Sequence, residues 1–222
     1  MDIDNFAQCI SYMRGVVETK SLWEKALPYG GGVLGVLIGF YANAIKEKLK
    51  EGRDTANKMM CIKEDVHRAR NSFELAVIEG MKALGRLKRN QTLKEHNMPS
   101  DFSLSMLDEY FYEIAHKYSS DERYWLKELL SYSDSLNSGV DKLLNAKGES
   151  KIQMVKYLMT VVDCASWCIN VSSLFLKDEV RKETGSLLAY LADKHSDKKD
   201  YCDYDVYKHW ENALTAPPEV CE

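Results

Sequence analysis

The chain has 222 residues, of which 45% are hydrophobic and 29% charged, a composition typical of a folded protein rather than of a disordered one. Its net charge of −4 excludes a broadly basic surface, so nucleic-acid binding would need a local basic patch. Six scattered cysteines form no dense disulfide framework and indicate reduced thiols. Only four prolines interrupt long stretches of helical apolar spacing, and the sequence therefore predicts an all-α fold.

An amphipathic helix is predicted for residues 1–25. Apolar residues recur there at alternating spacings of three and four, which places them on one helix face: Ile3, Phe6, Ile10, Met13 and Val17. Such a face packs on a partner helix or lies on a membrane surface.

The next twenty residues, 26–45, carry no charge, whereas Lys25 precedes them and Lys46 follows. A helix of this length spans roughly the 30 Å hydrocarbon core of a bilayer, so the segment is predicted to be a transmembrane helix. The alternative is a buried core helix or an interfacial segment. More Lys and Arg residues follow the span than precede it, which predicts a single pass through the inner (cytoplasmic) membrane with a cytoplasmic C-terminal domain.

Small residues recur at every fourth position within this span. Gly31, Gly35, Gly39 and Asn43 therefore share one helix face. In lipid, helices associate where small residues let their backbones approach closely, so this row predicts an interface of a homo-oligomer. The alternative is that the glycines only loosen the helix, since glycine is a poor helix former in water.

Residues 46–194 are predicted to form a cytoplasmic bundle of about four helices. A kink is expected at Gly52, and the polar, proline-containing stretch 90–103 is expected to be a loop. Ser119, with a glutamate three residues later, has the pattern of a capping box and predicts a helix that runs to about Asn145.

Apolar spacing of three and four then continues through residues 152–187, which corresponds to about ten helical turns. Within this stretch, residues 157–176 contain one charge in twenty residues. They are interpreted as the buried central helix of the bundle, because Asp163 would be costly facing lipid; a second membrane span is the alternative. Residues 195–222 are expected to be a polar C-terminal tail with a short helix at 203–214.

No cofactor or metal site is predicted. The stretch 195–209 is rich in His, Cys and Asp, but it lacks the paired Cys-x2-Cys elements of zinc sites and the glycine and glutamate positions of an EF-hand. The sequence contains no phosphate-binding loop, dinucleotide fingerprint, nucleophile elbow or HExxH motif. These absences count against the commoner classes of soluble enzyme and favour a non-enzymatic role.

The stretch RNQTLKEH begins with Arg89 and Asn90 and ends with His96. It resembles the R-x4-6-H signature of the helical HEPN ribonuclease superfamily, in which two such motifs form a composite site in a dimer. The resemblance implies that His96 and Arg89 act on the RNA 2′-hydroxyl and the scissile phosphate without a metal. The alternative is a solvated basic loop, because Arg and His fall at this spacing by chance in many chains.

The layout as a whole resembles that of small membrane-anchored helical accessory and effector proteins of bacterial antiviral defence systems, some of which have HEPN-like bundles. It implies a non-enzymatic membrane oligomer that alters membrane permeability, or scaffolds a partner, when its bundle receives a signal. One alternative is a membrane-tethered ribonuclease, the only hypothesis with nucleic acid as a partner. The other is a soluble helical adaptor in which 26–45 belongs to the core.

Overall fold

The structure is a computed structural model that describes residues 22–91, 97–146 and 148–215, with side chains from residue 36 onward. All regular elements in these ranges are helices, which confirms the all-α prediction. The amphipathic helix expected for residues 1–25 lies outside them, except for residues 22–25, which begin helix α2.

Helix α2 (Leu22–Lys88) is 67 residues long and contributes to two compact units, residues 1–54 and 55–222. The segment 26–45 is helical and belongs to the first unit. At Gly52, where the sequence predicts a kink, α2 is helical on both sides, and an added Cβ atom would meet nothing within 4 Å. No close contact therefore requires a glycine there.

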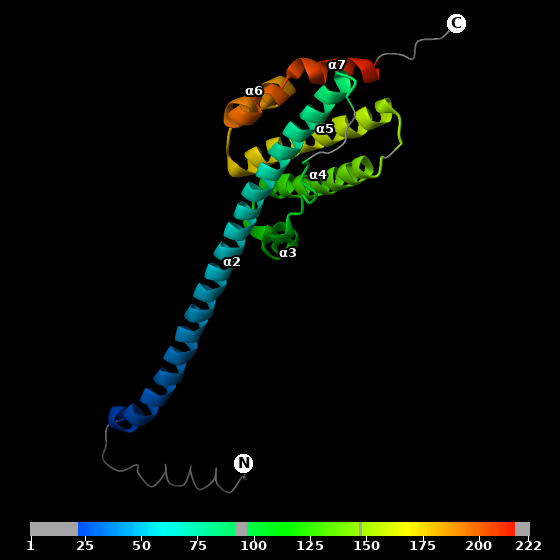
Figure 1. Cartoon of the computed structure of the whole chain (residues 1–222). Coiled ribbons are helices and arrows are strands. Elements are labelled where there is room, and N and C mark those ends of the chain that lie inside the picture. The colour runs from blue at the N-terminus through cyan, green and yellow to red at the C-terminus, as the bar shows by residue number, and fades with distance from the viewer. Residues whose placement is uncertain (1–21, 92–96, 147, 216–222) are drawn as a thin grey trace. The chain divides into compact units, whose positions relative to one another are not determined.

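The second unit contains the C-terminal part of α2 and, within the described ranges, a series of shorter helices. In chain order they are α3 (Ser105–Ile114), η1 (Ala115–Lys117), α4 (Ser120–Leu144), α5 (Lys151–Leu176), α6 (Thr184–Lys194), η2 (Ser196–Tyr201) and α7 (Tyr204–Thr215), of which η1 and η2 are short 3-10 helices. α5 packs along α4 on one side and contacts α7 on another, and α7 also contacts α6 (Figure 1). α5 is therefore the central helix of this bundle.

The bundle core forms where the apolar faces of these helices meet. Phe73 of α2 is fully buried and stacks on Phe102, with ring centroids 6.0 Å apart. α2 and α5 approach closely at Gly80, where an added Cβ atom would lie 2.6 Å from Cγ2 of Val162. Carbon atoms do not pack at that distance, so any larger residue at Gly80 would force Val162 or the helices to shift.

The predicted capping box is confirmed at the start of α4. The Ser119 hydroxyl accepts a hydrogen bond from the Glu122 backbone N–H (3.2 Å), and the Glu122 carboxylate accepts one from the Ser119 N–H (2.9 Å). α4 ends at Leu144 with Asn145 as its C-cap residue, where the sequence predicts its end. The two hydrogen bonds satisfy backbone donors that have no partner within the helix.

Helix α3 receives its cap from another helix. Its N-cap residue, Leu104, has no side-chain acceptor, and the Asp65 carboxylate of α2 accepts from the N–H groups of Met106 (2.9 Å) and Leu107 (3.2 Å) instead. Asp65 is buried, and its other carboxylate oxygen lies 2.5 Å from Nη2 of Arg68. A negative charge at a helix N-terminus is stabilising, so Asp65 holds α3 against α2.

The apolar spacing through residues 152–187 does not form one helix of ten turns. α5 ends at Leu176, and Lys177 adopts the left-handed backbone conformation, with φ of 61°. The N–H of Asp178 donates to a carbonyl five residues earlier (2.9 Å), which is the closing bond of a Schellman motif. The chain is then non-helical until α6 begins. The spacing was misleading because two separate helices that pack on one core carry apolar residues in compatible positions.

The bundle also extends past α6, where the sequence predicts a polar tail. The expected short helix is confirmed as α7, and its Val206, Tyr207 and Trp210 are buried in the same core as the other helices. The Trp210 indole N–H donates to the carbonyl of Leu84 in α2 (3.0 Å). Residues 195–215 are therefore part of the bundle.

Candidate functional site

One helix in the described part of the chain is long and apolar enough to cross a membrane. It is α5, in which the most apolar window has a mean hydropathy of 1.4, and 56% of that window is buried. Val155, Leu158 and Val161 are fully buried among other core residues. This burial supports the interpretation of 157–176 as the central helix of the bundle, because much of its apolar surface is already covered.

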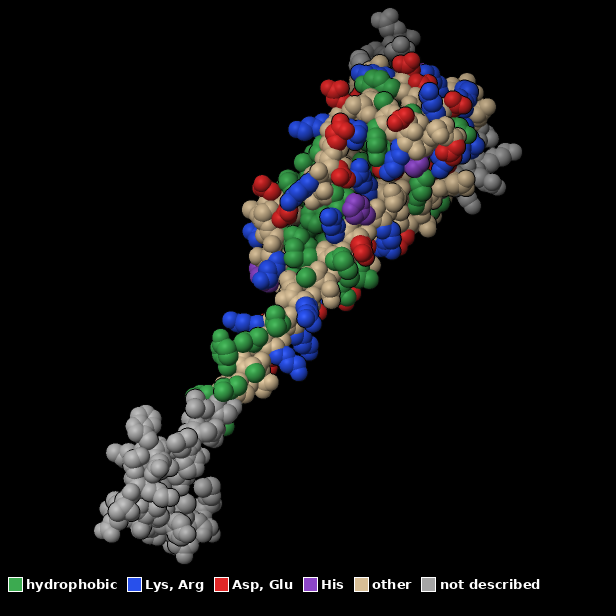
Figure 2. Space-filling view, turned by 90° about the vertical axis from the view of Figure 1, so that its left-hand side faces the viewer, with side chains coloured by type: hydrophobic (Ala, Val, Ile, Leu, Met, Phe, Trp, Pro, Cys, Tyr) green, Lys and Arg blue, Asp and Glu red, His purple; other side chains and the backbone are tan. Residues whose placement is uncertain are grey.

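The described side chains of the segment 26–45, those of residues 36–45, differ from α5 in their exposure. The exposed fraction is 59% for Leu37, 67% for Ile38 and 72% for Phe40. In Figure 2, the described side chains nearest the lower grey atoms are largely apolar, and lysine and arginine side chains follow them. A helix that exposes several large apolar side chains in succession needs lipid or protein to cover them.

Gly31, Gly35, Gly39 and Asn43 all lie in α2, where the sequence places them. An added Cβ atom at Gly39 would meet nothing within 4 Å, and Asn43 is exposed. The surroundings of Gly31 and Gly35 lie outside the described side chains. The described half of this row, Gly39 and Asn43, is thus uncovered in the single chain.

Arg89 and Asn90 lie just after the last residue of α2, and His96 lies outside the described residues. Asn90 has φ of 56°, and its N–H donates to the Leu87 carbonyl (3.0 Å), so it ends the helix in the left-handed conformation that asparagine tolerates. Its side-chain oxygen accepts a hydrogen bond from Nζ of Lys151 (2.6 Å). These contacts give Asn90 a structural role at the end of α2, whereas the Arg89 side chain is exposed.

Arg89→Ala and His96→Ala are expected to leave RNA cleavage and the cellular phenotype as in the wild type. The backbone and side-chain hydrogen bonds of Asn90 terminate the helix and account for its presence without catalysis, and the Arg89 side chain is exposed. RNA incubation with the purified full-length chain and a growth assay would measure the two effects. Loss of RNA cleavage in either variant, with folding and membrane insertion intact, would establish the ribonuclease instead.

Glu74 of α2 is the most deeply buried charged residue among those the structure describes. Its carboxylate lies 2.7 Å from Nζ of Lys194, 3.2 Å from Nε2 of His195 and 3.6 Å from Nε of Arg70. Arg70 also pairs with Asp178 in the segment after α5 (2.5 Å). The cluster joins three segments of the bundle around one carboxylate that has no access to water, so we assign it a structural role.

Sequence reasoning missed this cluster. The only local signal is a glutamate within the apolar run of residues 73–78, and Lys194 lies 120 residues further along the chain. His195 begins the stretch rich in His, Cys and Asp, and its ring faces Glu74. In the described ranges, no group of three or more His, Cys, Asp or Glu side chains is placed to hold a metal ion.

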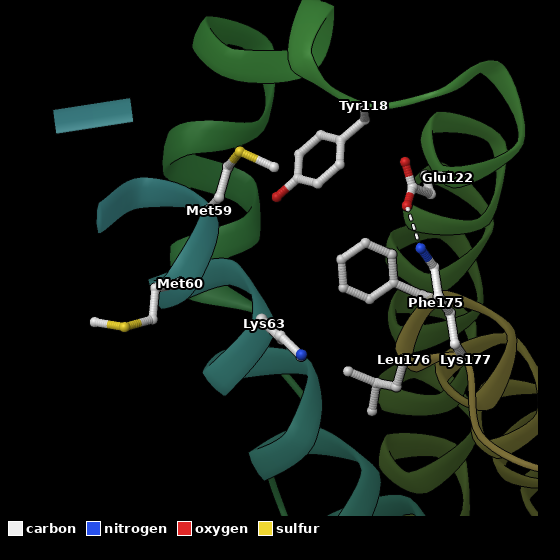
Figure 3. A pocket seen from close by; sticks show the side chains of 8 residues that line it. All are labelled: Met59, Met60, Lys63, Tyr118, Glu122, Phe175, Leu176 and Lys177. Carbon is white, nitrogen blue, oxygen red and sulfur yellow. Dashed lines mark ion pairs between the residues drawn. The ribbon is translucent and has the colours of Figure 1, made fainter. Parts of the chain in front are cut away.

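A cavity of about 320 Å³ opens between α2, α4 and the C-terminal end of α5 (Figure 3). Three charged side chains interrupt its apolar and aromatic walls, and the lining residues are Met59, Met60, Lys63, Tyr118, Glu122, Phe175, Leu176 and Lys177. Tyr118 packs edge-on against Phe175, with ring centroids 5.9 Å apart. The volume is at the lower end of the range for small-molecule pockets.

No protein family model, curated protein sequence or solved structure matches this chain. The class of protein is therefore defined by the structure alone: in the described residues it is an all-α protein with one packed helical bundle and one helical segment whose described apolar side chains are exposed. The assignment of function depends on these features alone.

Proposed function

We propose that this protein is a single-pass membrane protein anchored by residues 26–45, with its helical bundle on the cytoplasmic side of the inner membrane. The observation that carries the proposal is the exposure of Leu37, Ile38 and Phe40 on α2. More than half of the most apolar window of α5 is buried within the bundle, whereas the described apolar side chains of the segment in α2 are exposed to water unless lipid covers them.

The residues at the end of the segment support the same placement. A shallow groove on the surface of α2 is lined by three apolar and three basic residues: Ala42, Ile45, Lys46, Leu49, Lys50 and Arg53. At the end of a membrane span, lysine and arginine bury their aliphatic stems against apolar surface and extend their charges to lipid phosphates. Basic residues on this side of the span favour a cytoplasmic bundle.

Anchored chains would associate through the row formed by Gly31, Gly35, Gly39 and Asn43. The uncovered surface at Gly39 supports this interface. The oligomer would act without enzymatic chemistry, as an effector that alters membrane permeability or as an accessory that scaffolds a protein partner. By layout alone, membrane-anchored helical proteins of antiviral defence systems provide an analogy.

Gly35→Leu is expected to weaken the oligomer without releasing the chain from the membrane. Leucine is more favourable than glycine at the centre of a span, but its side chain would hold apart two helices that meet at this row. Detergent-solubilised wild type and variant would be compared by cross-linking and native mass measurement. We expect the distribution to shift from oligomer to monomer.

Val36→Leu is the matched control, because it adds one methylene on another helix face and leaves the row intact. A dye-leak assay in vesicles separates the two modes of action. Leakage that falls in Gly35→Leu indicates that the oligomer makes the membrane permeable, whereas an oligomer without leakage indicates scaffolding. An unchanged oligomer in Gly35→Leu would refute the glycine interface.

A further inference from the structure

The cavity at the end of α5 contains a polar group that the folded chain leaves without a partner. The Tyr118 hydroxyl is buried and has no hydrogen-bond partner among the described residues, and only 6% of the Tyr118 surface is exposed. Figure 3 shows this hydroxyl pointing toward α2, next to Met59. A hydroxyl that loses water without gaining an acceptor destabilises the fold, so a ligand that supplied an acceptor would be favourable.

Two lysines give the cavity a positive charge. Lys63 of α2 forms no ion pair within the described ranges, and in Figure 3 its amine points toward the end of α5. Nζ of Lys177 lies 3.9 Å from the Glu122 carboxylate, and 79% of the Lys177 side chain is exposed. Hydrogen bonds from Ser119 hold the pKa of Glu122 below its usual value, so this carboxylate remains charged. The two lysines exceed the one glutamate, and the lining favours an anion.

Lys177 contributes positive charge to the cavity although its backbone conformation is unfavourable for lysine. It is the left-handed residue that ends α5, with φ of 61°, a position that glycine usually occupies. Glycine would relieve the backbone but would remove a cation from the rim of the cavity. The lysine at this position is therefore consistent with a requirement for positive charge.

We propose that this cavity binds a small carboxylate that carries a short apolar chain. The chain would contact Met59, Phe175 and Leu176, and the carboxylate would pair with Lys63 and accept a hydrogen bond from the Tyr118 hydroxyl. Met59 has a flexible thioether side chain and lies beside that hydroxyl, so it can move aside for a ligand.

The Tyr118 hydroxyl is suited to donate such a bond at neutral pH. Burial, and to a smaller extent the charge of Glu122, raise the pKa of Tyr118 to about 12. The phenol therefore remains protonated under cellular conditions and offers its proton to an acceptor.

This inference does not depend on the membrane anchor, because every lining residue belongs to the second unit, residues 55–222. If the anchor and the cavity both exist, the cavity is where the bundle would receive a signal. Fractionation that shows no membrane anchor would leave the ligand-binding proposal intact. A chain that binds no ligand would leave the proposal of a membrane anchor intact.

Octanoate is a suitable first ligand, titrated into the full-length chain held in phosphatidylcholine nanodiscs. Isotope-labelled methyl groups of Met59 and Met60 are expected to show saturable NMR shifts, whereas those of Met154 and Met159, which do not line the cavity, are expected to stay unchanged. Octanol has the same chain without the charge and is expected to bind about tenfold more weakly, since each tenfold change in affinity corresponds to about 1.4 kcal/mol. Shifts that do not saturate, or equal binding of octanol, would overturn the proposal.

Tyr118→Phe distinguishes a ligand contact from a structural role. Removing the unpartnered hydroxyl is expected to raise the unfolding temperature of the free protein and to weaken octanoate binding about tenfold. A purely structural residue would not change stability and affinity in opposite directions. Lys63→Gln is expected to weaken binding to a similar extent with stability unchanged, because Lys63 is exposed. Unchanged affinity in both variants contradicts the assigned contacts.

Discussion

Full-length protein is expected to stay with membranes through an alkaline carbonate wash and to float with them in a density gradient. A chain that begins at Lys46 is expected to be soluble and helical. The physical reason is that the uncharged segment 26–45 exposes its described apolar side chains, whereas those of α5 are largely covered by the bundle. Flotation separates protein held by lipid from aggregated protein, which sediments.

Leu37→Lys makes this test specific to one helix. A lysine near the centre of a span costs about 3 kcal/mol, which is roughly a hundredfold in partitioning, so most of the variant is expected in the soluble fraction. Val161→Lys is the matched change in α5, where Val161 is fully buried. It is expected to disrupt the bundle, seen as a loss of near-UV circular dichroism, and to leave the chain in the membrane. The reverse pattern would identify α5 as the span.

Glu74→Ala is expected to lower the free energy of unfolding of the bundle by about 3–5 kcal/mol. Glu74 is fully buried and lies within 3.6 Å of two cations, Lys194 and Arg70, and of the His195 ring, and Arg70 is itself buried. Without the carboxylate, Asp178 is the one ion-pair partner that Arg70 keeps among the described residues, and a buried guanidinium would lose part of its compensation. Tryptophan fluorescence during denaturant unfolding of the solubilised full-length chain measures the change.

Two controls show whether burial causes the loss. Glu113→Ala removes the pair with Lys58, in which 61% of the Glu113 side chain is exposed, and it is expected to cost less than about 1 kcal/mol. The double variant Arg70→Met with Glu74→Met removes both buried charges and is expected to recover most of the stability lost in Glu74→Ala. A loss in Glu74→Ala no larger than that in Glu113→Ala contradicts a structural role for the cluster.

Local sequence signals were sufficient to predict the helices and several of their ends. The capping box at Ser119 acts over three residues, and the end of α4 at Asn145 follows from the change to polar residues. Ser150 likewise accepts from the N–H of Gln153 at the start of α5. Such signals could be read because all their participants lie within one turn of helix.

Contacts between distant residues could not be predicted in this way. Asp65 caps α3 from 41 residues away, and Trp210 binds a carbonyl of α2 from 126 residues away. The end of α5 at Leu176 and the packing of α7 belong to the same class, because each depends on what the chain meets after it reverses direction. Apolar spacing shows which side chains avoid water but carries no information about what covers them.

The same distinction applies to the candidate sites. The sequence by itself determined the all-α class, the uncharged segment 26–45 with its glycine row, and the motif that contains Arg89 and His96, since each is a local pattern. Only the tertiary structure decided that more than half of the apolar window of α5 is buried and that Glu74 forms an ion pair with Lys194 of a distant helix. It also decided that Tyr118 lines a cavity. The cavity could not be seen in the sequence because its walls come from α2, Tyr118 at the end of η1, the start of α4 and the end of α5, and their packing alone brings those residues together.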